Sequence, residues 1–126
     1  MAKTYLLIAA LNGFLAVALG AFGAHGLKQK LSADMLAIYH TGVQYHFYHT
    51  FALFGVALLM LQWPQSGALR WSALLFVIGI AIFSGSLYVL ALTGIRWLGA
   101  ITPLGGVAFL AGWIMLAVAA WKMEVA

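Results

Sequence analysis

The sequence predicts an all-α protein, a bundle of four transmembrane helices with a short interfacial helix before the second span. Of the 126 residues, 66% are hydrophobic and only 6% are charged, whereas a soluble domain is about 25% charged. So few charges cannot give a globule a water-facing surface, and in lipid a helix satisfies its own backbone hydrogen bonds. At about 20 apolar residues per crossing, the chain has room for four spans in a single membrane domain.

Charged residues and helix breakers separate the expected spans, which cover residues 4–26, 43–62, 71–92 and 103–121. Between the first two, residues 27–42 form a polar linker and the short interfacial helix, for which Ser32 is the expected N-cap. The fourth span is expected to open with Thr102 as N-cap and Pro103 at the first helical position. Four tryptophans mark the predicted interfaces, as is typical of membrane helices: Trp63, Trp71, Trp97 and Trp121.

Four spans place both termini on one side of the membrane, which we call side X; the opposite side is side Y. Each side carries three basic residues: Lys3, Arg70 and Lys122 on side X, and Lys28, Lys30 and Arg96 on side Y. The positive-inside rule is therefore tied, and only the free amino terminus favours side X as cytoplasmic. Single basic residues at span ends indicate membrane lipids as partners, and the absence of a basic stripe argues against nucleic acid.

Polar and small residues gather in the side Y half of every expected helix. This pattern predicts either a shallow site for a ligand or a hydrogen-bonded packing layer between helices. The candidate contacts are imidazole, phenol and hydroxyl groups, which can donate and accept hydrogen bonds. They are His25, Tyr45, His46, His49, Ser84, Tyr88 and Thr102.

The histidines also raise the possibility of a metal site. At about 100° per residue, His46 and His49 lie roughly 60° apart on one helix face, and His25 from the first helix could be a third ligand. Neutral imidazole suits copper or zinc, and two histidines on facing helices could hold a haem. No carboxylate accompanies the histidines, so the main expectation is that the protein has no cofactor.

Small residues recur every four positions along the first helix. Ala9 with Gly13, and Ala16 with Gly20 and Ala24, form two ridges of the kind along which membrane helices pack closely. The ridges predict a packing seam, either within the bundle or between the protomers of a homo-oligomer.

The acidic residues limit the functions that fit. The only two, Asp34 and Glu124, lie outside the expected spans, whereas coupled proton or cation transport usually relies on a carboxylate within the membrane. A nucleophile with its base and acid is also absent from the sequence pattern. We therefore expect a protein that is not an enzyme.

Four segments together resemble the DUF423 family: residues 20–27 (GAFGAHGL), 39–49, 83–94 (FSGSLY and ALTG) and 101–106 (ITPLGG). The resemblance covers essentially the whole chain. It implies a small four-span protein of the bacterial inner membrane, with mitochondrial relatives similar to transmembrane protein 256. It implies no particular activity or catalytic residues.

Three functional hypotheses follow. In the first, the polar layer binds a lipid-like molecule, a small ligand or a partner subunit. In the second, the histidines make the chain a metal- or haem-binding accessory protein of a respiratory or oxidase complex. In the third, the first-helix ridge assembles an oligomeric channel or carrier for small solutes.

Overall fold

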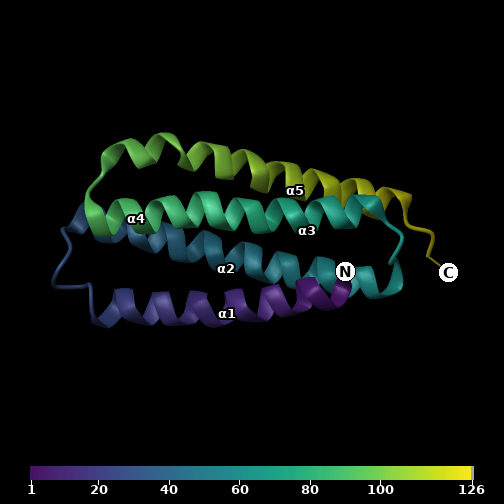
Figure 1. The fold of residues 1–126 in the computed structure, drawn as a ribbon, viewed down its shortest axis with the longest axis horizontal. Helices are drawn as coiled ribbons and strands as arrows, with labels where there is room; N and C mark the ends of the chain where they lie inside the picture. Colours follow the sequence, from purple (N-terminus) through teal and green to yellow (C-terminus); the bar gives the residue numbers. More distant parts are fainter. Residues whose placement is uncertain (126) are drawn as a thin grey trace.

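A computed structural model describes residues 1–125, which form four long helical rods. Three neighbouring elements, α3, η1 and α4, join end to end as the third rod, in which η1 is one turn of π-helix. The rods alternate in direction, so both termini lie at the same end of the bundle (Figure 1). The elements are α1 (Ala2–His25), α2 (Ala33–Gln62), α3 (Gly67–Gly79), η1 (Ile80–Ser84), α4 (Gly85–Thr93), the 3-10 helix η2 (Arg96–Ala100) and α5 (Thr102–Lys122).

Three of the four rods are long and apolar enough to cross a membrane: Ala2–His25, Gly67–Thr93 and Arg96–Lys122. Helix α2 falls outside this group, and it carries three of the chain's four histidines and three of its five tyrosines, which lower its hydropathy. It nevertheless packs lengthwise between α1 and the third rod (Figure 1). This packing between two candidate spans supports the expectation that α2 is a fourth span.

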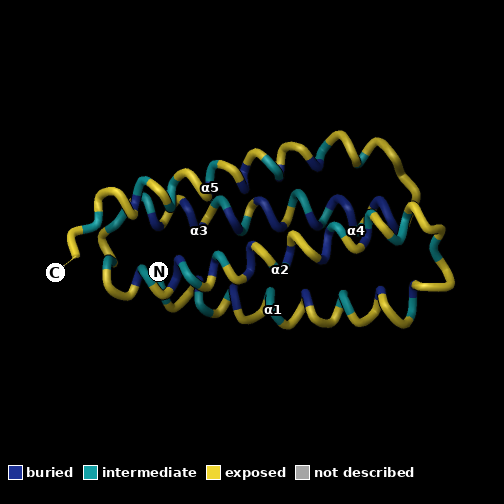
Figure 2. The backbone as a smooth tube through the Cα atoms, turned by 180° about the vertical axis from the view of Figure 1, so that it is seen from behind, coloured by how far each residue is buried: buried dark blue, intermediate teal, exposed yellow. Residues whose placement is uncertain are grey.

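The rods pack largely in chain order. Helix α1 lies mainly on α2, which in turn contacts α3, η1 and α4, while α5 packs on α3 and η1. Figure 2 shows buried positions on the facing sides of the rods and exposed positions along their outer sides. The outer side chains are mostly apolar, among them Leu7, Phe14, Leu110 and Ile114. Such a surface suits lipid as the solvent.

The small-residue ridge of α1 faces α2. Ala9 and Ala16 are buried, and a Cβ at Gly20 would lie 3.4 Å from the Val43 side chain. Of the ridge residues, only Ala24 is exposed. The ridge is therefore a packing seam within the chain, which leaves little of it for contacts between protomers.

The interfacial segment is continuous with the second span. Ser32 caps α2 as expected, with its hydroxyl accepting from the Met35 amide at 3.2 Å. No break follows at Gly42, which lies inside the continuous helix, and its missing side chain leaves room for the Tyr88 ring. The 30 residues of α2 extend about 45 Å at 1.5 Å per residue. This exceeds a hydrocarbon core of about 30 Å, so the first turns project into the headgroup layer without forming a separate helix.

The N-cap prediction for α5 is wrong. Pro103 occupies the first turn as expected, but the helix begins at Thr102 itself, and the capping position belongs to Ile101. The Thr102 hydroxyl instead pairs with the Ser86 hydroxyl at 2.6 Å. A tertiary hydrogen bond to the third rod has replaced the local cap.

Candidate functional site

His46 joins three of the four rods. Its Nε2 lies 2.9 Å from the Asn12 Oδ1 of α1, and its Nδ1 lies 2.8 Å from the Tyr88 hydroxyl of α4. The Asn12 amide is oriented by its own donation to the Ile8 carbonyl at 2.9 Å, so its oxygen must accept from His46. His46 therefore carries its proton on Nε2, and Nδ1 accepts from Tyr88. Both ring nitrogens are occupied within the bundle.

His49 lies one turn further along α2 and faces a different neighbour. The indole N–H of Trp113 on α5 donates to His49 Nε2 at 3.1 Å, and His49 Nδ1 lies 2.9 Å from the Tyr45 carbonyl. Because an indole nitrogen can only donate, Nε2 must accept, and the proton is on Nδ1. The imidazole also stacks on Phe109, with ring centroids 3.5 Å apart and planes 8° apart. The His49 ring thus contacts α5, whereas the His46 ring bonds to Asn12 of α1 and Tyr88 of α4.

The buried hydroxyls of Ser84, Ser86 and Thr102 are also paired inside the bundle. Ser84 donates to the Gly42 carbonyl at 2.8 Å, and Thr102 is paired with Ser86 as described above. With Tyr88 engaged by His46, three of the predicted contact residues hold helices together. This arrangement matches the packing interpretation, in which hydroxyls bridge neighbouring membrane helices.

His25 does not join the other two histidines. It is exposed at the end of α1, whereas the α1 residue that contacts His46 is Asn12, thirteen positions earlier, or about 20 Å along the helix. Among residues 1–125, no group of three histidine, cysteine or acidic side chains could hold a metal ion. The three-ligand set for copper or zinc is therefore not assembled, and metal or haem binding stays a hypothesis without a geometry to support it.

Tyr45 opens onto a groove between α2 and α5, which we call the lateral groove. It has a volume of about 460 Å³ and lies between Tyr45 and His49 of α2, Phe83 of η1, and the Pro103–Trp113 stretch of α5. Its walls are mostly aromatic, and the Tyr45 and Phe83 ring centroids are 4.6 Å apart. Tyr45 is 38% exposed, and its hydroxyl bonds to no residue that the structure describes.

The groove lies in the side Y half of the bundle and begins at the first turn of α5. Pro103 lies in the first turn of α5 and Trp113 ten residues later, a rise of about 15 Å. This is half of a hydrocarbon core of about 30 Å. The length of the groove therefore matches about one leaflet, and Tyr45 lies one turn nearer side Y than His49.

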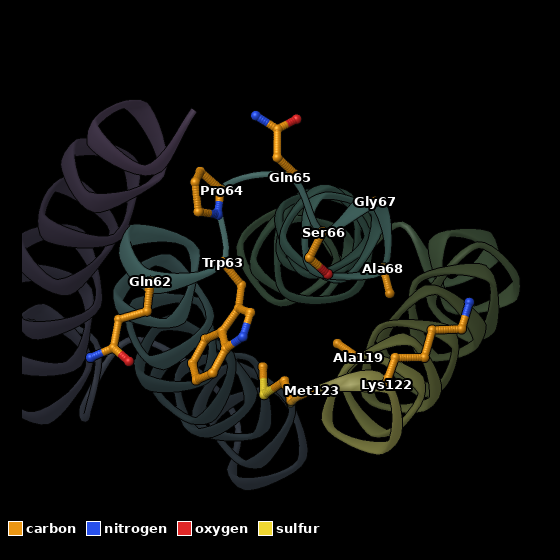
Figure 3. A pocket seen from close by; sticks show the side chains of 10 residues that line it. All are labelled: Gln62, Trp63, Pro64, Gln65, Ser66, Gly67, Ala68, Ala119, Lys122 and Met123. Atoms are coloured by element: carbon orange, nitrogen blue, oxygen red, sulfur yellow. The ribbon is translucent and has the colours of Figure 1, made fainter. Parts of the chain in front are cut away.

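A second and larger cavity, of about 580 Å³, lies at the side X end of the bundle. It is formed by the α2–α3 connection (62–68) and the end of α5. In Figure 3, Trp63 and Met123 line its interior, whereas the polar ends of Gln62 and Lys122 extend away from it. None of the predicted site residues reaches this cavity.

Two residues of the site were not among the predicted contact residues, although the sequence position of each could have indicated a role. Asn12 is the only amide in the middle of the first span, and a lone polar group in hydrocarbon needs a partner. Trp113 is the one tryptophan that does not fall at a predicted interface. An off-interface tryptophan needs a buried acceptor for its N–H, and His49 supplies it.

The rods and their lipid-facing groove define a small multi-pass helical membrane protein. Residues 19–106 match the family model described as protein of unknown function, DUF423. The chain belongs to this family, which confirms the resemblance found in its sequence.

Relatives align with nearly the whole chain. The UPF0382 membrane protein YwdK of Bacillus subtilis is 52% identical over 95% of this chain and 98% of its own length. The UPF0382 inner membrane protein YgdD of Escherichia coli is 44% identical over 94% of this chain and 90% of its own. These names agree with the expected location in a bacterial inner membrane, and the apolar rods agree with several passes. No solved structure matches the chain.

Proposed function

We propose that this protein is a non-enzymatic lipid-binding bundle whose ligand lies in the lateral groove. The observation that carries the proposal is how the polar groups of the groove walls are used. The Trp113 N–H is bonded to the buried His49, so the half-exposed Trp113 presents the apolar surface of its indole to the groove. The groove thus combines an apolar lining with one free hydroxyl, which is the usual pattern of a small-molecule pocket.

The proposed ligand site is therefore the lateral groove and not the adjacent polar layer that the sequence predicted. Of the seven predicted contact residues, Tyr45 and His49 line the groove. Ser84, Tyr88 and Thr102 are engaged in helix contacts. Their role in the proposal is to fix α2, the third rod and α5 so that the groove keeps its shape.

Filling the groove tests the proposal. A Cβ at Gly106 would lie 3.9 Å from the Phe83 ring, an ordinary contact, so Gly106→Leu should fold while its side chain occupies the groove. Gly55→Leu is the matched control, because a Cβ at Gly55 meets nothing within 4 Å and Gly55 does not line the groove.

The measurement is native mass spectrometry of protein purified in mild detergent. We expect wild type and Gly55→Leu to retain one lipid-sized adduct and Gly106→Leu to lose it, with equal helix content by circular dichroism. Equal adducts in all three proteins would show that the lipid is bound elsewhere and would contradict the proposal.

A further inference from the structure

The lateral groove carries information about the head of its ligand. Among its lining residues there is no lysine, arginine, aspartate or glutamate. A charged head inside the groove would therefore lose its hydration without gaining a counter-charge, which is costly. The groove suits a ligand whose head is uncharged.

One hydrogen-bond donor is left for that head. The imidazole and indole N–H groups are already used, whereas the Tyr45 hydroxyl bonds to no residue that the structure describes, and Tyr45 lies one turn nearer side Y than His49. A phenol donates readily to a carbonyl oxygen. The head should therefore carry a carbonyl, placed just inside the hydrocarbon.

The walls add a preference of shape. Tyr45 and Trp113 are 38% and 45% exposed and present ring surface to the groove, whereas Phe109 and His49 are buried and stack on each other behind them. Tyr45 also packs on Phe83, with ring centroids 4.6 Å apart. A saturated acyl chain makes no specific contact with an aromatic side chain, whereas a planar conjugated ring can form offset-stacked and edge-to-face contacts with it.

We infer that the ligand is an isoprenoid quinone, with a carbonyl accepting from Tyr45 and its prenyl tail running toward Trp113. The inference rests on the proposed function and names its ligand class. The 15 Å or so between Pro103 and Trp113 holds the ring and the first prenyl units, and the rest of the tail continues in lipid. Only binding is inferred, with no electron transfer.

The first test is extraction. Protein purified from bacterial membranes in mild detergent is extracted with organic solvent, and quinone is measured by its absorption and mass. We expect about one quinone per chain, and far less from Gly106→Leu, with Gly55→Leu as control. Bound phospholipid without quinone would overturn the inference and leave the proposed function standing. A bound molecule retained equally by wild type and Gly106→Leu would contradict both.

The second test measures affinity. Short-tailed ubiquinone is titrated into protein held in nanodiscs of phosphatidylcholine, with quenching of tryptophan fluorescence as the signal, because Trp113 lines the groove. Loss of one hydrogen bond in Tyr45→Phe should weaken binding about two- to tenfold. The exposed Tyr48 lies outside the groove, so Tyr48→Phe should leave the affinity unchanged. Equal affinities in wild type and Tyr45→Phe would overturn the assignment of the head to Tyr45.

Discussion

Two histidines one turn apart on α2 have opposite hydrogen-bond environments. His46 donates through Nε2 to Asn12, whereas His49 accepts through Nε2 from Trp113. Both are at most 5% exposed. A charge at such a depth is expensive, so neutral rings in opposite tautomers satisfy every neighbour without one.

We therefore predict opposite tautomers for the two rings in lipid. Nitrogen-15 NMR of histidine-labelled protein should show one ring protonated at Nε2 and one at Nδ1, with Tyr88→Phe perturbing the first and Trp113→Phe the second. The two exposed histidines, His25 and His40, provide solvent-facing reference signals. Finding the same tautomer for both rings would contradict this arrangement. A metal bound to either buried ring would displace one of its hydrogen bonds, so chemical shifts that change when a chelator is added would contradict it as well.

The sequence could place these histidines near each other on one side of α2 but could not identify their partners. Helical periodicity puts His46 and His49 on one face, and both are indeed buried. The roughly 60° between them is enough to direct one toward α1 and α4 and the other toward α5. Such a choice depends on which rods are neighbours, and periodicity within one helix contains no information about that.

At the level of elements, η1 and α5 approach each other closely at Gly105. A Cβ at Gly105 would collide with the backbone of Phe83, whereas one at the adjacent Gly106 would meet only its ring at ordinary distance. The π-helical turn and the glycine thus bring two backbones together beside the groove. π-Helical turns are frequent at functional sites, and this one supplies Phe83 to the groove wall.

Adjacent glycines give a matched test of this contact. Gly105→Ala should destabilise the fold by about 1–3 kcal/mol, because an extra methyl in a packed seam strains the backbone. Gly106→Ala should be neutral or stabilising by up to about 1 kcal/mol, since alanine favours the helix. Reversible unfolding in mixed micelles measures both, and equal stabilities would show that α5 is not held against η1.

The limits of the rods follow from the sequence, whereas their internal irregularity does not. The predicted span 71–92 lies within the Gly67–Thr93 rod, because charged and breaking residues mark where hydrocarbon ends. The π turn at Ile80–Ser84 gives no such signal. It accompanies two contacts with other rods: the hydrogen bond from Ser84 to the Gly42 carbonyl of α2, and the close approach of Phe83 to Gly105 of α5.

At the scale of the whole molecule, the polar half and the groove both lie toward side Y, while the termini lie on side X. A lipid in the groove would thus come from the side Y leaflet. Which compartment that leaflet faces is not fixed by charge, because each side carries three basic residues. What the packing does fix is that the two termini share a side, provided that α2 crosses the bilayer with its neighbours.

The number of crossings gives the last prediction. Three apolar rods alone would leave the termini on opposite sides, whereas four place them together, as the bundle does (Figure 1). Reporter fusions at Met1 and after Val125 should therefore give the same compartment, and a reporter inserted between Lys28 and Lys30 should give the opposite one. An α2 lying flat on the membrane surface would instead separate the two terminal reporters. It would also break the Asn12–His46 and His46–Tyr88 hydrogen bonds, because α1 and α4 could then no longer lie on either side of the same helix.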